Sequence, residues 1–169
     1  MNFITSFLKK IESKEYSKDS IIRLHARRYK DFDERSIIRD QNISIPIDDG
    51  HSSVKKLIKK SKLVINTYIS TSYLELSASN IPNILFTQSF RDILDEKSTK
   101  IFEELKKNKM YFDNSDDLEK FLTKNYNSIT EWWQSKEVQD CRKYLCENFA
   151  KFKSDKIKEL SSIIKQNNI

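Results

Sequence analysis

Apolar side chains recur along the chain at two spacings, and each spacing predicts a different kind of element. A spacing of three and four residues predicts an amphipathic helix over about residues 2–13. The same spacing predicts further helices that begin near Ser53, Ser72, residue 98 and Asp113, the last opening a long helical region. Short apolar runs lie between the helices and predict strands over residues 20–25, 43–47, 63–67, 83–87 and 110–112.

Strands and helices alternate from residue 20 to about residue 130. This order is typical of βαβ units, in which right-handed crossover helices join parallel strands. The runs 63–67 and 83–87 are short and largely apolar, as expected for strands buried on both faces. We therefore predict an α/β fold, a Rossmann-like three-layer sandwich with a parallel sheet of about five strands and an extended helical C-terminus. The single domain is divided into an N-terminal helix in 1–19, an α/β core in 20–113 and C-terminal helices in 114–169.

The polar segments between these elements predict a loop, a turn and several helix starts. The charged stretch 26–42 is expected to be a loop with little regular structure. Asp48-Asp49-Gly50 has the chemistry of a turn. Ser72 and Glu75 have the spacing of a capping box, in which each side chain bonds a backbone N–H at a helix start. Ser52 or Ser53 can cap the helix that carries Val54 and Leu57. Ser135 is expected to cap a later helical segment, and a further segment is expected to start at Ser154.

Glycine is almost absent from the chain, and this limits how it can bind phosphate. Gly50 is the single glycine among 169 residues, where about twelve would be usual. Glycine-rich loops of dinucleotide-binding folds, Walker-type enzymes and kinases need several glycines at fixed spacing, so they are excluded. Alanine and proline are also scarce while lysine, asparagine and isoleucine are abundant, which indicates a compositional bias of the genome. Phosphate binding without a glycine loop therefore remains open.

Composition also bounds the environment that we expect for the protein. Hydrophobic residues make up 37% of the chain, enough for a buried core. No apolar run approaches the roughly 20 residues of a membrane span, and the N-terminus lacks the features of a signal peptide. Cys141 and Cys146 lie five residues apart on one expected helix and are interpreted as reduced thiols. We expect a cytoplasmic bacterial protein.

Charge and the scarcity of histidine restrict the chemistry further. Lysine and arginine number 31 against 25 acidic residues, a net charge of +6 that suits anionic ligands but is scattered along the chain. The two histidines form no cluster with zinc spacing, so no metal site is expected. Asp48 and Asp49 could ligate Mg²⁺, although a turn is the simpler use. Trp132 and Trp133 favour anchoring a helix to the core over stacking on nucleic-acid bases.

Three consecutive hydroxyls follow the third expected strand and open the next helix. Ser70, Thr71 and Ser72 stand where ligands of open α/β sheets bind, at the carboxyl end of a strand. The first turn of a helix adds free N–H groups and a partial positive charge, which together suit an anion. The plainer alternative is that these side chains only cap the helix and fill a turn, and spacing alone leaves both open.

A second group of candidate residues follows the first expected strand. Arg23, His25, Arg27 and Arg28 would reach the same edge of the sheet if the first strand lies near the third. Arginine grips phosphate oxygens with two parallel hydrogen bonds, and histidine can donate a hydrogen bond or act as a base. The alternative is a solvated basic loop whose charges pair locally with the acidic residues in 31–34.

The segment 57–86 carries a pattern of motifs that points to a known group of enzymes. A strand is followed by T-Y-x-x-T-x-x-L-E, a helix with small residues, N-x-P and another strand, here at Thr67-Tyr68, Thr71, Leu74-Glu75 and Asn80-Ile81-Pro82. This order resembles the C-terminal half of GT-B-type glycosyltransferases, in particular a family of bacterial transferases of surface-carbohydrate (O-antigen or capsule) biosynthesis. The resemblance covers about residues 20–155 and continues downstream at Phe102–Leu105, Tyr111–Asp113, the W-W-x-S-x-x-V-Q segment Trp132–Gln139 and Cys146–Ala150.

The resemblance implies roles for the candidate residues. In GT-B enzymes this half holds the nucleotide part of the donor, so Ser70, Thr71 and Ser72 would contact phosphate. Glu75 would contact ribose or sugar or cap the helix, and Arg23 would be a second phosphate contact. The remaining donor-site candidates are His25, Arg27, Thr67 and Tyr68. The donor would be a nucleotide-activated sugar, with no metal or other cofactor.

The resemblance also implies what this chain lacks. A complete GT-B enzyme places its active site between two Rossmann-like domains, and this chain predicts one. We expect a separate or missing N-terminal domain and no transfer by this chain alone. The sequence departs from the family at Ile69-Ser70, where a small residue or glycine is usual, and at Thr87-Gln88, where an aromatic is usual. The first alternative to a transferase domain is a non-catalytic nucleotide- or phosphate-binding α/β module. A nucleic-acid-binding protein is a weaker alternative, and no specific nucleic acid is expected as a partner. Peripheral membrane association is compatible with the charge.

Overall fold

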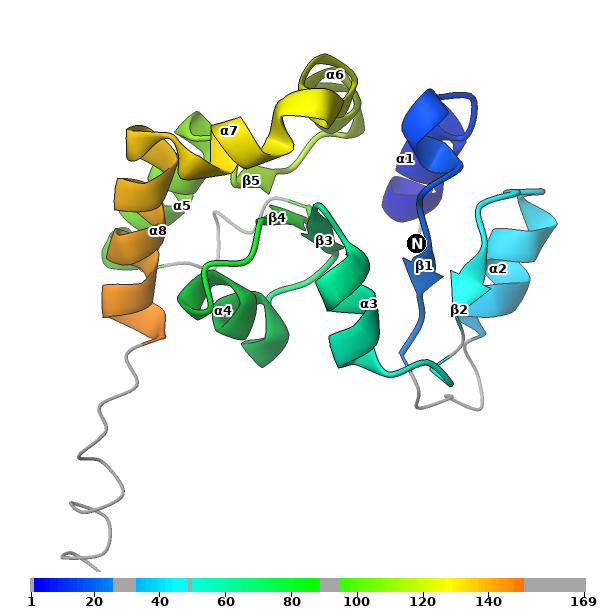
Figure 1. The fold of residues 1–169 in the computed structure, drawn as a ribbon, viewed down its shortest axis with the longest axis horizontal. Coiled ribbons are helices and arrows are strands. Elements are labelled where there is room, and N and C mark those ends of the chain that lie inside the picture. The colour runs from blue at the N-terminus through cyan, green and yellow to red at the C-terminus, as the bar shows by residue number, and fades with distance from the viewer. Residues whose placement is uncertain (1, 26–32, 49, 89–94, 151–169) are drawn as a thin grey trace, which may run out of the picture.

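The computed structural model describes residues 2–25, 33–48, 50–88 and 95–150 as an α/β protein with parallel strands (Figure 1). The strands are β1 (Ile22–Arg23), β2 (Ile47–Asp48), β3 (Val64–Asn66), β4 (Asn83–Phe86) and β5 (Tyr111–Phe112). The helices are α1 (Asn2–Ile11), α2 (Glu34–Asp40), α3 (Val54–Lys60), α4 (Thr71–Ala78), α5 (Glu96–Lys107), α6 (Ser115–Asn125), α7 (Ile129–Gln134) and α8 (Lys136–Phe149). The described residues also form the 3₁₀ turns η1 (Glu15–Ser17) and η3 (Tyr126–Ser128).

The described strands form two parallel sheets, which corrects the expectation of one sheet of about five strands. β1 pairs with β2, and β4 lies between β3 and β5. β1 and β2 are two residues long, so each has few backbone groups with which to extend a ladder. The core is nevertheless continuous, because Ile22 and Ile47 join the same hydrophobic cluster as Ile65 and Ile84.

Alternate residues of β4 face two different hydrophobic clusters, and this shows the three layers that the sequence predicts. Ile84 and Phe86 belong to the cluster that contains residues of α1 and α6, where Phe86 stacks on Phe3 at 4.3 Å between ring centroids. Leu85 belongs to the other cluster, with residues of α4, α5 and α8. All four β4 residues are buried, as predicted. The same prediction for β3 is wrong, because its residues are half-buried and, among the described strands, β3 pairs with β4 alone.

Several expected boundaries and one expected loop are wrong. The first helix ends at Ile11 instead of residue 13, and the expected loop 26–42 contains α2, capped by Asp33, whose carboxylate accepts from the Arg35 N–H at 3.0 Å. The second strand is Ile47–Asp48 instead of 43–47, so Asp48 ends a strand. Pro46 precedes this strand because it has no N–H to donate to a ladder.

Of the expected serine caps, the one at Ser72 needs correction. α4 is capped by Ser70, whose hydroxyl accepts from the Tyr73 N–H at 3.4 Å, so the Ser72–Glu75 capping box does not form. Ser70 has the extended backbone of a cap residue, which leaves Ser72 inside the first turn. Ser53 and Ser135 do stand at the N-cap positions of α3 and α8, but their side chains make no capping hydrogen bond. The segment expected to start at Ser154 lies outside the described residues.

The two tryptophans anchor helices to the core, as predicted. Trp133 is fully buried, and its indole N–H donates to the backbone and side-chain oxygens of Asn80 at 3.2 and 3.0 Å. Gln139 donates to the same Asn80 side chain and to the Trp133 carbonyl. Asn80 has a left-handed backbone, with φ of 55°, at the end of α4. The W-W-x-S-x-x-V-Q segment therefore fixes the turn between α4 and β4.

The cysteines lie on α8 and are both free, which confirms the expectation of reduced thiols. Burial raises the pKa of the Cys141 thiol to about 11 and raises that of Cys146 as well. Both groups therefore stay protonated near neutral pH and are poor nucleophiles. Within the described ranges, no helix is both long and apolar enough to cross a membrane.

Candidate functional site

The hydroxyl-rich segment after β3 is presented to solvent. Thr67 is half-buried, and Tyr68 and Ile69 are 58% and 47% exposed. Ser70 caps α4, and the side chains of Thr71 and Ser72 are exposed in its first turn. The backbone N–H groups of this turn have no carbonyl four residues before them within the helix. Two free hydroxyls and the positive end of an eight-residue helix therefore share one surface.

Glu75 lies one turn further along α4 and is exposed. Residues four apart are neighbours on a helix surface, so Glu75 follows Thr71 on the same face. A carboxylate there repels phosphate but accepts hydrogen bonds from hydroxyls. The position suits a sugar or ribose contact beside a phosphate contact.

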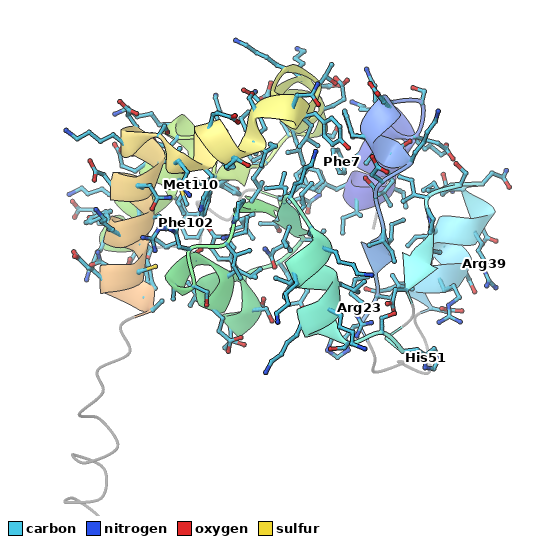
Figure 2. All side chains as sticks on the ribbon, in the orientation of Figure 1. Phe7, Arg23, Arg39, His51, Phe102 and Met110 are labelled. Carbon is cyan, nitrogen blue, oxygen red and sulfur yellow. The ribbon has the colours of Figure 1, made fainter. Side chains whose placement is uncertain are left out.

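Arg23 ends β1 and is held by the segment after β2 (Figure 2). Its guanidinium donates to the Asp48 carboxylate at 2.6 Å, to the Ser52 carbonyl at 3.0 Å and to the Gly50 carbonyl at 3.3 Å. These contacts differ from the alternative of local pairing with the acidic residues in 31–34, because Arg23 bonds across the β1–β2 pair. Its described hydrogen bonds all go to residues 48–52, so Arg23 orders the loop that leads into α3.

Asp48 is the buried counterpart of Arg23. It is 7% exposed, and its Oδ1 accepts from Arg23 and from the N–H groups of Gly50 at 2.9 Å and Ser52 at 3.4 Å. Hydrogen bonds from the Ser52 side chain and from the Gly50 and Ser52 backbone, with the nearby Arg23 charge, hold the pKa of Asp48 at about 2. A guanidinium at this distance opposes a cation, so the geometry favours turn stabilisation over Mg²⁺ binding. Across the described part of the chain, no group of three or more metal-ligating side chains comes together.

Replacing Asp48 with asparagine should change how stability depends on pH. The folded pKa of about 2 lies below the ordinary value of 3.8, so the ionised carboxylate stabilises the fold fully above about pH 4 and progressively less as pH falls toward 2. The wild-type protein should therefore exceed Asp48→Asn in free energy of unfolding at pH 6, with a difference that shrinks at pH 3. Urea unfolding of both proteins across this range measures the difference. A difference that stays constant from pH 6 to pH 3 would contradict the role of the charge.

The remaining candidates are distributed over the same ends of the strands. His25 follows β1 and is exposed, and His51 is exposed in the loop after β2, where Figure 2 shows it close to Arg23 at the lower edge of the view. Arg27 and Arg28 lie outside the described residues. The structure thus brings Arg23, Asp48 and residues 50–52 together, while Thr67 to Ser72 form a separate group at the start of α4.

Asn66 is a candidate that the sequence analysis missed. It ends β3 immediately before Thr67, and its side-chain Nδ2 is buried without a hydrogen-bond partner. A buried amide donor without an acceptor is costly, and a ligand or an ordered water can supply the acceptor. The sequence could have identified Asn66, because it is a polar residue at the end of an otherwise apolar strand, where ligands of α/β sheets bind.

The fold and this surface define the class of protein. Parallel strands between two helical layers, with hydroxyls opening a helix at the carboxyl end of a strand, make it an α/β protein of Rossmann-like architecture. The family model of the LIC12162 family transferases matches residues 1–164, and the chain belongs to that family. Neither a curated protein nor a solved structure matches the chain.

Family membership supports a transferase-like function for this chain. The hydrogen bonds and the exposure of the motif residues separate them into two kinds. Asn80, Trp133 and Gln139 bond one another and build the fold. Thr71, Ser72 and Glu75 are exposed and are available to a ligand.

Proposed function

We propose that this chain is the donor-binding part of a glycosyltransferase-like enzyme and holds a nucleotide-activated sugar at the start of α4. The observation that carries the proposal is the pair of exposed hydroxyls, Thr71 and Ser72, in the first turn of a helix that follows β3. Helix starts bind phosphate because free N–H groups and the helix dipole both favour negative charge. Family membership supports a transferred group, and an activated diphosphate is a common leaving group for such transfer.

In this proposal, each of the neighbouring residues contacts a different part of the donor. The diphosphate lies against the hydroxyls of Thr71 and Ser72 and the first amides of α4. Asn66, whose Nδ2 lacks an acceptor, supplies a further donor to phosphate or sugar. Tyr68, which is 58% exposed, offers a ring face to the base, and Glu75 accepts from a hydroxyl. Arg23 contributes by ordering residues 50–52.

The same arrangement would assist the chemical step. As the bond between the sugar and the diphosphate breaks, negative charge grows on the leaving phosphate oxygens. Hydrogen-bond donors already directed at those oxygens stabilise that charge without reorganising, and no metal ion is strictly needed. The acceptor and the base would come from a second Rossmann-like domain, as in GT-B enzymes. That requirement, a role in surface-polysaccharide synthesis and a cytoplasmic location stay predictions.

Calorimetric titration with UDP, GDP, CDP and CMP tests the proposal. We expect a preferred nucleotide and tighter binding of its diphosphate than of its monophosphate, because the second phosphate reaches the start of α4. Inorganic pyrophosphate serves as a control for general attraction to a basic protein. Equal, weak binding of all compounds would contradict a donor site. Nucleotide binding without transfer, even together with a matching N-terminal domain, would favour the alternative of a non-catalytic binding module.

A further inference from the structure

Several apolar side chains around α3 lie outside both hydrophobic clusters. Leu57 and Ile58 on α3 and Val64 on β3 are half-buried, and neither cluster includes them. Ile21, just before β1, and Val54, at the start of α3, are 46% and 50% exposed. None of the α3 residues is fully buried. The surroundings of α3 therefore hold apolar surface that the described core does not cover.

Two strands beside α3 each have a backbone edge without a partner strand. Among the described strands, β1 pairs with β2 alone and β3 with β4 alone. The N–H groups of Ile22 and Leu24 donate toward β2 at 2.8 and 2.9 Å, and that of Val64 donates toward β4 at 3.0 Å. Successive N–H groups of a strand point to opposite edges. The N–H of Arg23 therefore points away from β2, and the N–H of Ile65 points away from β4.

The connection of the chain indicates that these two edges belong to one sheet. A helix joins the two strands of each observed pair, and each pair is parallel. α3 joins β2 to β3 in the same way, and such a crossover helix packs across the sheet that holds both strands. In the view of Figure 1, α3 lies between the two sheets, and β1 is the strand of its pair nearer to β3. The order that follows is β2-β1-β3-β4-β5.

Pairing of β1 with β3 would also cover the apolar residues around α3. Ile22 and Ile65 pack against the cluster that contains residues of α1 and α6. Successive side chains of a strand point to opposite faces, so Ile21 and Val64 lie on the other face of their strands. Two adjoining strands would give the apolar side of α3 a continuous surface on that face.

We propose that β1 and β3 pair when the donor binds, which joins the two sheets into one beneath α3. The described structure is the open arrangement. The proposal rests on the proposed function, because the bound diphosphate drives the pairing. The carboxyl ends of neighbouring parallel strands lie at one edge, so closure brings the Arg23 end of β1 toward the hydroxyls of Thr71 and Ser72. A ligand shifts a conformational equilibrium by its difference in affinity for the two states, and contacts from both strand ends exist only in the closed one.

Hydrogen exchange of single amides, followed by NMR, tests this closure. The 169-residue chain is measured alone and with saturating UDP, GDP and CDP in turn. A nucleotide that binds should slow exchange of the Arg23 and Ile65 amides at least tenfold, because both enter the new ladder. The Ile47 amide is the matched control, since it points to the outer edge of β2, which stays unpaired. Its exchange should change less than about twofold.

The outcomes of this measurement separate closure from donor binding. Nucleotide binding that leaves the Arg23 and Ile65 amides exchanging as before would overturn closure and leave the donor site standing. Protection of the Ile47 amide to the same extent would also overturn it, because the effect would then be general. No binding of any of the three nucleotides would overturn both proposals.

Serine substitutions test the packing that closure creates. Ile21→Ser and Val54→Ser each remove an apolar contact made only in the closed state, so each should weaken nucleotide binding about fivefold. Tyr144→Ser is the matched control, because Tyr144 is 42% exposed on α8 and should leave the affinity unchanged. Circular dichroism checks that each variant is folded, which these exposed positions allow. Wild-type affinity in both Ile21→Ser and Val54→Ser would overturn the proposal.

Discussion

Replacing Trp133 with alanine should lower the free energy of unfolding by about 3–5 kcal/mol. The side chain is fully buried between α4, β4 and α8, so its removal leaves a cavity that the surrounding helices cannot close without moving. The change also removes the indole N–H that donates to both oxygens of Asn80. This loss is a large part of the roughly 5–15 kcal/mol that a domain has in total.

Urea unfolding followed by far-UV circular dichroism measures this effect. Trp133→Phe keeps most of the ring volume and removes the N–H, so it should lower the free energy of unfolding clearly less than Trp133→Ala. The difference between the two variants separates the contribution of packing from that of the hydrogen bonds. Tyr144→Ala is the matched control, because Tyr144 lies on α8 but is 42% exposed, and its loss should stay within about 0.5 kcal/mol. A Trp133→Ala protein within 1 kcal/mol of wild type would contradict the anchoring role.

Thr71→Ala and Ser72→Ala should each weaken binding of the preferred nucleotide diphosphate about tenfold, and together about 100-fold. Hydrogen bonds to a charged group are worth about 1.5–3 kcal/mol, which corresponds to at least a factor of ten each. Both hydroxyls are exposed and neither caps the helix, so the variants should stay folded.

Ser79→Ala provides the control for these variants. Ser79 is an exposed serine at the opposite end of the same helix, so its hydroxyl is remote from a ligand at the helix start. Calorimetric titration should give it the wild-type affinity. Unchanged affinity in both Thr71→Ala and Ser72→Ala would contradict phosphate binding at this turn.

The sequence predicts best those elements whose pattern is local and strong. The β4 residues form an unbroken apolar run and are all buried between two helical layers. α2 was missed because its seven residues include four charged side chains, and its one fully buried residue, Ile38, is covered by distant parts of the core. The split into two sheets was equally out of reach, because pairing between β1 and β3 depends on tertiary geometry that apolar spacing does not encode.

The site shows the same division between local and distant information. The hydroxyl turn could be located, because its serines and threonine follow a strand and open a helix. The sequence could not show which serine caps the helix, because Ser70 and Ser72 have the same side chain and only backbone geometry distinguishes them. The partner of Arg23 was missed because Asp48 is 25 residues away and meets it across a parallel strand pair. The neighbours of Asp48 in the sequence predict only a turn.

The most direct test of the donor site is a titration of Ser72→Asp with the preferred nucleotide diphosphate. Aspartate in the first turn of a helix is favourable to the helix dipole, so α4 should be as stable as in wild type or slightly more so. The same carboxylate would repel a phosphate bound there. We expect a folded protein whose nucleotide affinity falls at least 100-fold. A folded Ser72→Asp protein that binds with wild-type affinity would contradict it.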